Sequence, residues 1–338
     1  MNAAAMHFPP AVGVGFAYAH LLLRTLHLLC HRSSLSHNTI NIMPNLSEAY
    51  KTLRTALQPG LANPADPVRL VREKMHAIHP TQYPDDVSVE HFEWNNVAVA
   101  SVQTPEVDSS DSAVMMVHGG AFVSTGIAHY IPYAAELARV FRRSVFIFEY
   151  RLAPEHPFPA ALDDSLTVYR KLKDGFGASK LAVIGDSCGG GIALSMLCQL
   201  RDTGGALPAA YAGLSPWFDL LMSGDAAQDP NATDPFVSAE WIRQRGLNYA
   251  GTEPPEQPAI SPLYADMAGP PLFLGTGSED ITRDDSRRLA AKALAAGTQV
   301  ELDIAPHMIH GYHGLSAMAP ECADGCRRVA DFLDRHLK

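Results

Sequence analysis

The sequence predicts an α/β fold with an eight-stranded, mostly parallel sheet and helices on both of its faces. From residue 113 onward, short apolar runs alternate with longer stretches of helical periodicity, and the runs are apolar almost throughout rather than at every second position. Strands of this kind are buried on both faces, as in parallel sheets covered by helices. The runs fall at 113–117, 145–148, 181–184, 209–214, 271–275 and 299–304, and the helical stretches at 129–142, 160–173, 188–201, 284–296 and 320–337.

An antiparallel hairpin precedes this alternation and completes the strand count. Residues 87–94 and 97–102 alternate apolar with polar positions around Asn95 and Asn96, a pair suited to a tight turn. Upstream, Pro67 at a first helical position and apolar residues three and four apart predict a helix ending near Ile78. A shorter helix is expected at 47–57.

One segment breaks the rhythm of strand and helix. Residues 219–267 are rich in Pro, Gly and Asp and contain a single helical stretch near 238–249. This is too long for an ordinary connection in a sheet of this kind, so it predicts an inserted functional element.

Charge and cysteine content exclude several classes of protein. Lys and Arg number 26 against 36 Asp and Glu, a formal charge of -10, so attraction to nucleic acid is not expected. The five cysteines contain no C-x-x-C pair, which argues against a zinc ribbon and a disulfide framework and favours a reducing, cytoplasmic location.

Residues 1–42 differ from the rest and are expected to be an extension of the domain at 43–338. The stretch 11–31 is apolar, but His20, Arg24, His27 and His31 form one polar stripe on a helix, which favours a helix lying at a membrane surface over a stable membrane span. The alternative is a disordered or non-native extension, with Met43 as the working start.

The sequence GDSCG at 185–189 lies between a predicted strand and a predicted helix. A G-x-S-x-G pattern in that setting is typical of a sharp turn that exposes a nucleophilic serine at the end of a sheet, with glycines where side chains would collide. Ser187 is therefore the predicted nucleophile.

A serine nucleophile requires a base and an acid that orients the base, expected in the order Ser, acid, His. After the strand at 271–275, Asp280 is the predicted acid, because Asp284 and Asp285 suit the N-terminus of the next helix. Glu279 is the next candidate. After the last strand, the stretch APHMIHGYH offers three histidines three apart, of which His310 is the predicted base. No acid lies nearby in that stretch, and a loop with Pro and Gly does not preset ligand geometry, so no metal is expected.

The transition state also needs hydrogen-bond donors for its oxyanion. HGGA at 118–121 follows a predicted strand and resembles the HGGG-type motif. The predicted donors are the backbone N–H groups of Gly119, Gly120 and Cys188.

At these residues the sequence resembles the hormone-sensitive lipase-like family of α/β-hydrolases, which includes many microbial carboxylesterases. The matching stretches are HGGAF at 118–122, YRLAPEHPFPAA at 150–161, GDSCGG at 185–190, SPWFD at 215–219, DITRD at 280–284 and HGY at 310–312. The resemblance implies the α/β-hydrolase fold with a helical cap formed from about 45–80 and 219–250. It also implies Ser187, Asp280 and His310 as the triad, with the oxyanion donors named above.

The resemblance implies a serine carboxylesterase acting on small or short-chain esters, with no cofactor. Lactone, amide and thioester hydrolysis on the same triad are alternatives, and a catalytically silent receptor of the same fold is disfavoured because His310 is present. A homodimer through the last strand is a further expectation. Cys188 stands where the family commonly has alanine, which suggests sensitivity to thiol reagents.

Overall fold

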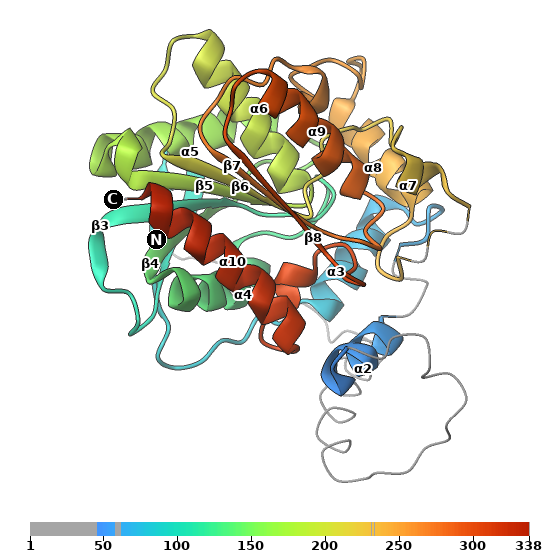
Figure 1. Ribbon diagram of the computed structural model, residues 1–338, viewed down its shortest axis with the longest axis horizontal. Coiled ribbons are helices and arrows are strands. Elements are labelled where there is room, and N and C mark those ends of the chain that lie inside the picture. Colours follow the sequence, from blue (N-terminus) through green and yellow to red (C-terminus); the bar gives the residue numbers. More distant parts are fainter. Residues whose placement is uncertain (1–45, 58–61, 231, 233, 338) are drawn as a thin grey trace, which may run out of the picture.

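An eight-stranded sheet in the order β1-β2-β4-β3-β5-β6-β7-β8 forms the centre of the computed structural model (Figure 1). The structure describes residues 46–57, 62–230, 232 and 234–337, so the predicted extension at 1–42 lies outside the described residues. Strands β1 and β2, and β2 and β4, pair antiparallel, and every other neighbouring pair is parallel. The strands are β1 Ser88–Trp94, β2 Val97–Gln103, β3 Ser109–Val117, β4 Arg143–Phe148, β5 Leu181–Asp186, β6 Ala210–Leu214, β7 Leu272–Gly277 and β8 Val300–Ala305. The predicted fold class is confirmed.

Helices cover both faces of the sheet (Figure 1). Helices α5, α6 and α9 lie over one face, while α4 and α10 lie over the other. Neighbouring residues of β3 accordingly face different cores. Met115 packs in the core beneath α5, α6 and α9, and Met116 packs in the core beneath α4 and α10. The helices are α2 Glu48–Ala56, α3 Val68–Ile78, α4 Ile127–Phe141, α5 Ala160–Phe176, α6 Cys188–Asp202, α7 Asp225–Gln228, α8 Ala239–Ala250, α9 Arg283–Ala295 and α10 Pro320–His336, with 3-10 turns at Ala178–Lys180, Pro262–Tyr264 and Tyr312–Leu315.

Two local predictions can be compared with the backbone. Asn95 and Asn96 have φ of 51° and 64°, the left-handed pair that a two-residue hairpin turn requires, and the predicted hairpin is confirmed. Helix α3 begins at Val68, one residue later than predicted, because Pro67 keeps an extended ψ of 153°.

The predicted insertion at 219–267 carries α7 and α8 and is held to α9 by buried carboxylates. Asp285 Oδ2 accepts the N–H groups of Phe218 and Asp219 at 2.8 and 2.9 Å, and Asp284 Oδ2 accepts that of Ala226 at 2.6 Å. Both residues lie in the first turn of α9, as expected, but their side chains make no cap hydrogen bond there and bind the backbone of the insertion.

The insertion also meets the N-terminal helices. Arg245 Nη1 of α8 donates to the Asp66 carbonyl, just before α3, at 3.3 Å. Helices α3, α7 and α8 therefore gather at one end of the sheet, on the right in Figure 1.

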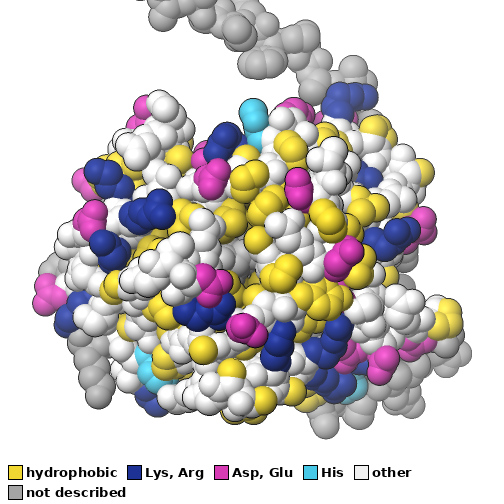
Figure 2. All heavy atoms as spheres, turned by 90° about the horizontal axis from the view of Figure 1, so that it is seen from above, with side chains coloured by type: hydrophobic (Ala, Val, Ile, Leu, Met, Phe, Trp, Pro, Cys, Tyr) yellow, Lys and Arg dark blue, Asp and Glu magenta, His cyan; other side chains and the backbone are white. Residues whose placement is uncertain are grey.

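Charges of both signs are interspersed on the face shown in Figure 2, and neither sign forms a large patch there. Within the described ranges, no helix is long and apolar enough to cross a membrane. Strand β8 lies at the sheet edge, and the predicted dimer through it stays a prediction.

Candidate active site

Ser187 sits on a strained turn between β5 and α6, at φ 52° and ψ -122°. Positive φ is costly for a residue with a side chain, so the surroundings must impose it. A Cβ on Gly185 would lie 2.5 Å from the Gly189 carbonyl oxygen, and one on Gly189 would lie 2.2 Å from that of Val117. The glycines of the motif are therefore sterically required for this turn.

The structure brings Ser187, His310 and Asp280 together from three separate connections. His310 Nε2 is 2.8 Å from Ser187 Oγ, and His310 Nδ1 is 3.0 Å from Asp280 Oδ1. Protonation at Nδ1 satisfies both contacts, because Nδ1–H then donates to Asp280 and Nε2 accepts the serine hydroxyl. This continuous chain can carry the Ser187 proton to the imidazole.

Asp280 is fully buried yet well provided with donors. Oδ1 accepts the N–H and Oγ1–H of Thr282, both at 2.8 Å, and Oδ2 accepts Thr276 Oγ1–H at 3.0 Å. Burial opposes ionisation, but the neighbouring His310 and these donors lower the pKa of Asp280 below its ordinary value. Asp280 is thus suited to remain an anion beside the imidazole.

The three histidines of the last loop have different surroundings. His307 is half exposed and lies 3.2 Å from Glu279 Oε1. The ring of His313 is buried, neither of its nitrogens has a hydrogen-bond partner among the described residues, and burial lowers its pKa to about 3. His310 is buried too, but the charges of Asp280, Asp234 and Asp186 outweigh that burial and raise its pKa. Within the described part of the chain, no group of His, Cys, Asp and Glu side chains is arranged to hold a metal ion.

The loop after β3 differs from the prediction at one donor. Gly119 N–H donates to Tyr130 Oη at 2.8 Å, so it is not free to face an oxyanion. The amides of Gly120 and Cys188 have no hydrogen bond to the described residues. Gly120, at φ 109°, could not carry a side chain, because its Cβ would lie 2.1 Å from the Ser124 carbonyl oxygen. We therefore revise the donor set to exclude Gly119.

Comparison with known proteins identifies the family. The family model described as alpha/beta hydrolase fold matches residues 114–314. The chain belongs to this hydrolase family. An acetyl-hydrolase of Streptomyces hygroscopicus is 34% identical over 62% of this chain and 70% of that protein. Carboxylesterase NlhH of Mycobacterium tuberculosis is 30% identical over 87% of this chain and 97% of its own length.

Solved structures agree with the sequence relatives of this hydrolase. The esterase EstE5, in a crystal soaked with p-nitrophenyl butyrate, superposes with a TM-score of 0.81 at 31% identity, over 86% of this chain and 99% of that chain. An esterase from the bacterial hormone-sensitive lipase family has a TM-score of 0.80 at 30% identity over the same shares. The chain is thus a carboxylic ester hydrolase of the hormone-sensitive lipase-like group.

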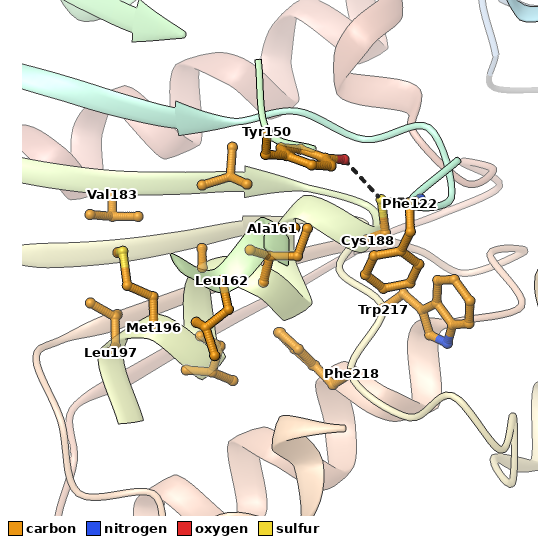
Figure 3. Packing of buried hydrophobic residues seen from close by; sticks show 14 of the residues in the cluster. Phe122, Tyr150, Ala161, Leu162, Val183, Cys188, Met196, Leu197, Trp217 and Phe218 are labelled. Atoms are coloured by element: carbon orange, nitrogen blue, oxygen red, sulfur yellow. Dashed lines mark hydrogen bonds between the residues drawn. The ribbon is translucent and has the colours of Figure 1, made fainter. Parts of the chain in front are cut away.

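Cys188 of this hydrolase is enclosed by aromatic side chains, as Figure 3 shows for Phe122, Tyr150 and Trp217. Its Sγ accepts the Phe122 N–H at 3.2 Å and lies 3.7 Å from Tyr150 Oη. The residue is fully buried, and that burial raises the pKa of the thiol to about 12. Burial and the raised pKa both argue against the expected sensitivity to thiol reagents, because reaction needs an accessible thiolate.

Sequence reasoning missed two side chains at this hydrolase site. Tyr130 Oη donates to Asp186 Oδ2 at 2.6 Å while accepting from Gly119, and nothing in the helical pattern of α4 marked it. Asp234 accepts the backbone N–H of His310 at 2.8 Å. The Asp-Pro pair at 234–235 lies in the irregular segment, where no local pattern distinguishes it.

Proposed function

We propose that this hydrolase is a serine carboxylesterase that cleaves small or short-chain acyl esters through a triad of Ser187, His310 and Asp280. The observation that carries the proposal is the pair of contacts at 2.8 and 3.0 Å that links the three side chains. These two distances match those between the nucleophile, the base and the orienting acid of acyl-transfer enzymes.

In the first half of the reaction, Ser187 Oγ attacks the ester carbonyl carbon while its proton passes to His310 Nε2. Asp280 holds the Nδ1–H tautomer and stabilises the imidazolium that forms. Collapse of the tetrahedral intermediate breaks the bond to the leaving alcohol, whose oxygen takes the proton from Nε2. In the second half, water attacks the acyl-enzyme through the same base and releases the carboxylic acid.

The N–H groups of Gly120 and Cys188 are the proposed oxyanion donors. Cys188 is the first residue of α6, so its N–H has no acceptor within the helix and the positive end of the helix dipole lies beside it. Gly119 acts indirectly, because its hydrogen bond to Tyr130 fixes the loop that carries Gly120.

The proposed cap consists of the N-terminal helices within about 45–80 and of the insertion within about 219–250. Tyr249 from α8 stacks on Phe122, with ring centroids 4.1 Å apart. This contact supports the role, because Phe122 lies in the loop after β3 that carries Gly120, here called the proposed oxyanion loop. A crystal of the related EstE5 was soaked with p-nitrophenyl butyrate, a short-chain ester, which supports the choice of small acyl groups.

The test is hydrolysis of p-nitrophenyl esters from acetate to palmitate by the wild type, Ser187→Ala and His310→Ala. We expect activity to be highest at short chains and kcat to fall by roughly 10⁴-fold or more in both variants. Equal rates for all three proteins would contradict the proposal, and circular dichroism checks that the variants are folded. Activity on lactones, amides or thioesters with no activity on these esters would favour the alternative substrates.

A further inference from the structure

Asp234 links the insertion to the loop that carries His310. Its Oδ2 accepts the backbone N–H of His310 at 2.8 Å, although the two residues are 76 positions apart in the chain. Asp234 lies in the insertion ahead of α8, and His310 follows β8. The proposed base is thus held on its side chain by Asp280 and on its backbone by Asp234.

The second oxygen of Asp234 is also used. Oδ1 accepts the N–H groups of Phe236 and Val237 at 2.8 and 3.3 Å, which closes the turn just before α8. Both oxygens therefore accept hydrogen bonds from backbone N–H groups. Asparagine has the same shape, but its NH₂ group would replace one of the two oxygens. That NH₂ group would then face a backbone N–H, so two hydrogen-bond donors would point at each other.

Asp234 also changes the electrostatics around His310. The imidazole is faced by carboxylates from three elements: Asp280 after β7, Asp234 from the insertion and Asp186 at the end of β5. Burial, together with the charge of Asp280, raises the pKa of Asp234 to about 6. The charge of Asp234 in turn raises the pKa of His310 and so favours its imidazolium form.

We propose that Asp234 is a positioning residue that fixes the loop of the base, couples it to the insertion and helps to stabilise the imidazolium. This inference rests on the proposed function, because it assigns His310 the role of base. In this arrangement, displacement of the insertion withdraws both a hydrogen bond and a charge from the base. The insertion would then influence the catalytic step as well as access of the substrate.

The experiment compares the pH dependence of kcat and kcat/KM for p-nitrophenyl butyrate between wild type, Asp234→Asn and a matched control, Asp225→Asn. Asp225 is an exposed carboxylate of the same insertion. In Asp234→Asn we expect kcat to fall by roughly tenfold to a hundredfold, with little change in KM. In the pH profile of kcat/KM, we also expect the rise on the acid side (the acid limb) to move to lower pH, because loss of the Asp234 charge lowers the pKa of His310. The control should retain the wild-type profile.

Asp234→Glu separates charge from geometry. The longer side chain keeps the charge, so the acid limb should stay near that of wild type, but kcat should fall because the His310 amide loses its placed acceptor. This variant also carries the test if Asp234→Asn does not fold. A wild-type kcat in Asp234→Glu, or a wild-type acid limb in folded Asp234→Asn, would overturn the inference while leaving the proposed function intact.

A readout without substrate keeps the two proposals distinguishable. NMR titration of the ¹⁵N-labelled His310 ring reports its pKa directly, and Asp234→Asn should lower that pKa even if none of these esters is cleaved. An unchanged pKa would overturn the electrostatic part of the inference. By contrast, equal ester hydrolysis by wild type and Ser187→Ala would contradict the proposed function alone.

Discussion

The turn at Ser187 and the insertion at 219–267 are held in place by different physical means. At the turn, backbone atoms approach so closely that only glycine fits at positions 185 and 189. The insertion contains little regular structure, and its backbone N–H groups are accepted by the buried carboxylates of Asp284 and Asp285 from α9 and by the partly buried Asp234 from within. Steric exclusion fixes the proposed nucleophile, whereas polar contacts between distant residues fix the surroundings of the base.

The difference has consequences for sequence change. A steric constraint fails with a single added methyl group, and the failure does not depend on pH. A buried carboxyl group that accepts several N–H groups is sensitive to its protonation state and to a change in its acceptor atoms, so its contribution to stability depends on pH. Four predictions test this contrast, from the largest expected effect to the smallest.

Adding a methyl group at Gly189 should break the turn. Gly189→Ala places Cβ against the Val117 and His118 carbonyl oxygens, and we expect the free energy of unfolding in urea to fall by at least about 3 kcal/mol, with loss of esterase activity. The control is Gly175→Ala in α5, where an added Cβ meets nothing within 4 Å. That variant should be neutral or more stable by up to about 1 kcal/mol. Equal stabilities of the two variants would contradict the steric account.

Truncating Tyr249 should loosen the contact between the insertion and the proposed oxyanion loop. The ring is buried and stacks on Phe122, so we expect Tyr249→Ala to lower the free energy of unfolding by about 3 kcal/mol and to reduce kcat. Tyr249→Phe should match wild type, because Tyr249 Oη has no partner among the described residues. A large loss in Tyr249→Phe would indicate that the hydroxyl has a role of its own.

Asp285 should make stability depend on pH. Burial, opposed by the N–H groups of Phe218 and Asp219, raises its pKa from 3.8 to about 8. A carboxyl group with a raised folded pKa contributes stability that is complete below the unfolded value and is lost as pH rises through the folded value. Between pH 4 and 8, wild type should therefore lose stability relative to Asp285→Asn, at up to about 1.4 kcal/mol per pH unit.

Urea unfolding of both proteins at pH 5 and pH 7.5 measures this difference. The stability of wild type relative to Asp285→Asn should be greater at pH 5. A constant difference across this range would show that Asp285 does not titrate there.

The smallest effect is expected at Cys188. Because the thiol is buried and its pKa is about 12, iodoacetamide should leave Cys188 unmodified in the native protein, with activity retained. Peptide mass spectrometry before and after unfolding in urea measures the modification. Rapid labelling of Cys188 in the native state would indicate that the aromatic enclosure opens in solution.

The sequence alone predicted the eight strands, their mostly parallel pairing and the position of the turn at Ser187. These features are readable because they have local causes: apolar runs for buried strands, glycines where side chains would collide, and two asparagines for a hairpin turn. It also provided Asp280 and His310 as candidates, since each follows a strand that ends at the same edge of the sheet. The contact distances between them could not be read from spacing.

Tertiary structure alone decided which amides stay free and which charges face the base. Gly119 and Gly120 are adjacent in a motif that predicts two donors, yet Tyr130 from the following helix occupies one of them. Asp284 and Asp285 lie in the first turn of α9 but bind another segment. Asp234 meets His310 only because the insertion folds back over the end of the sheet. Hydrogen bonds between residues far apart depend on ångström-scale placement, and no local pattern in a sequence encodes that placement.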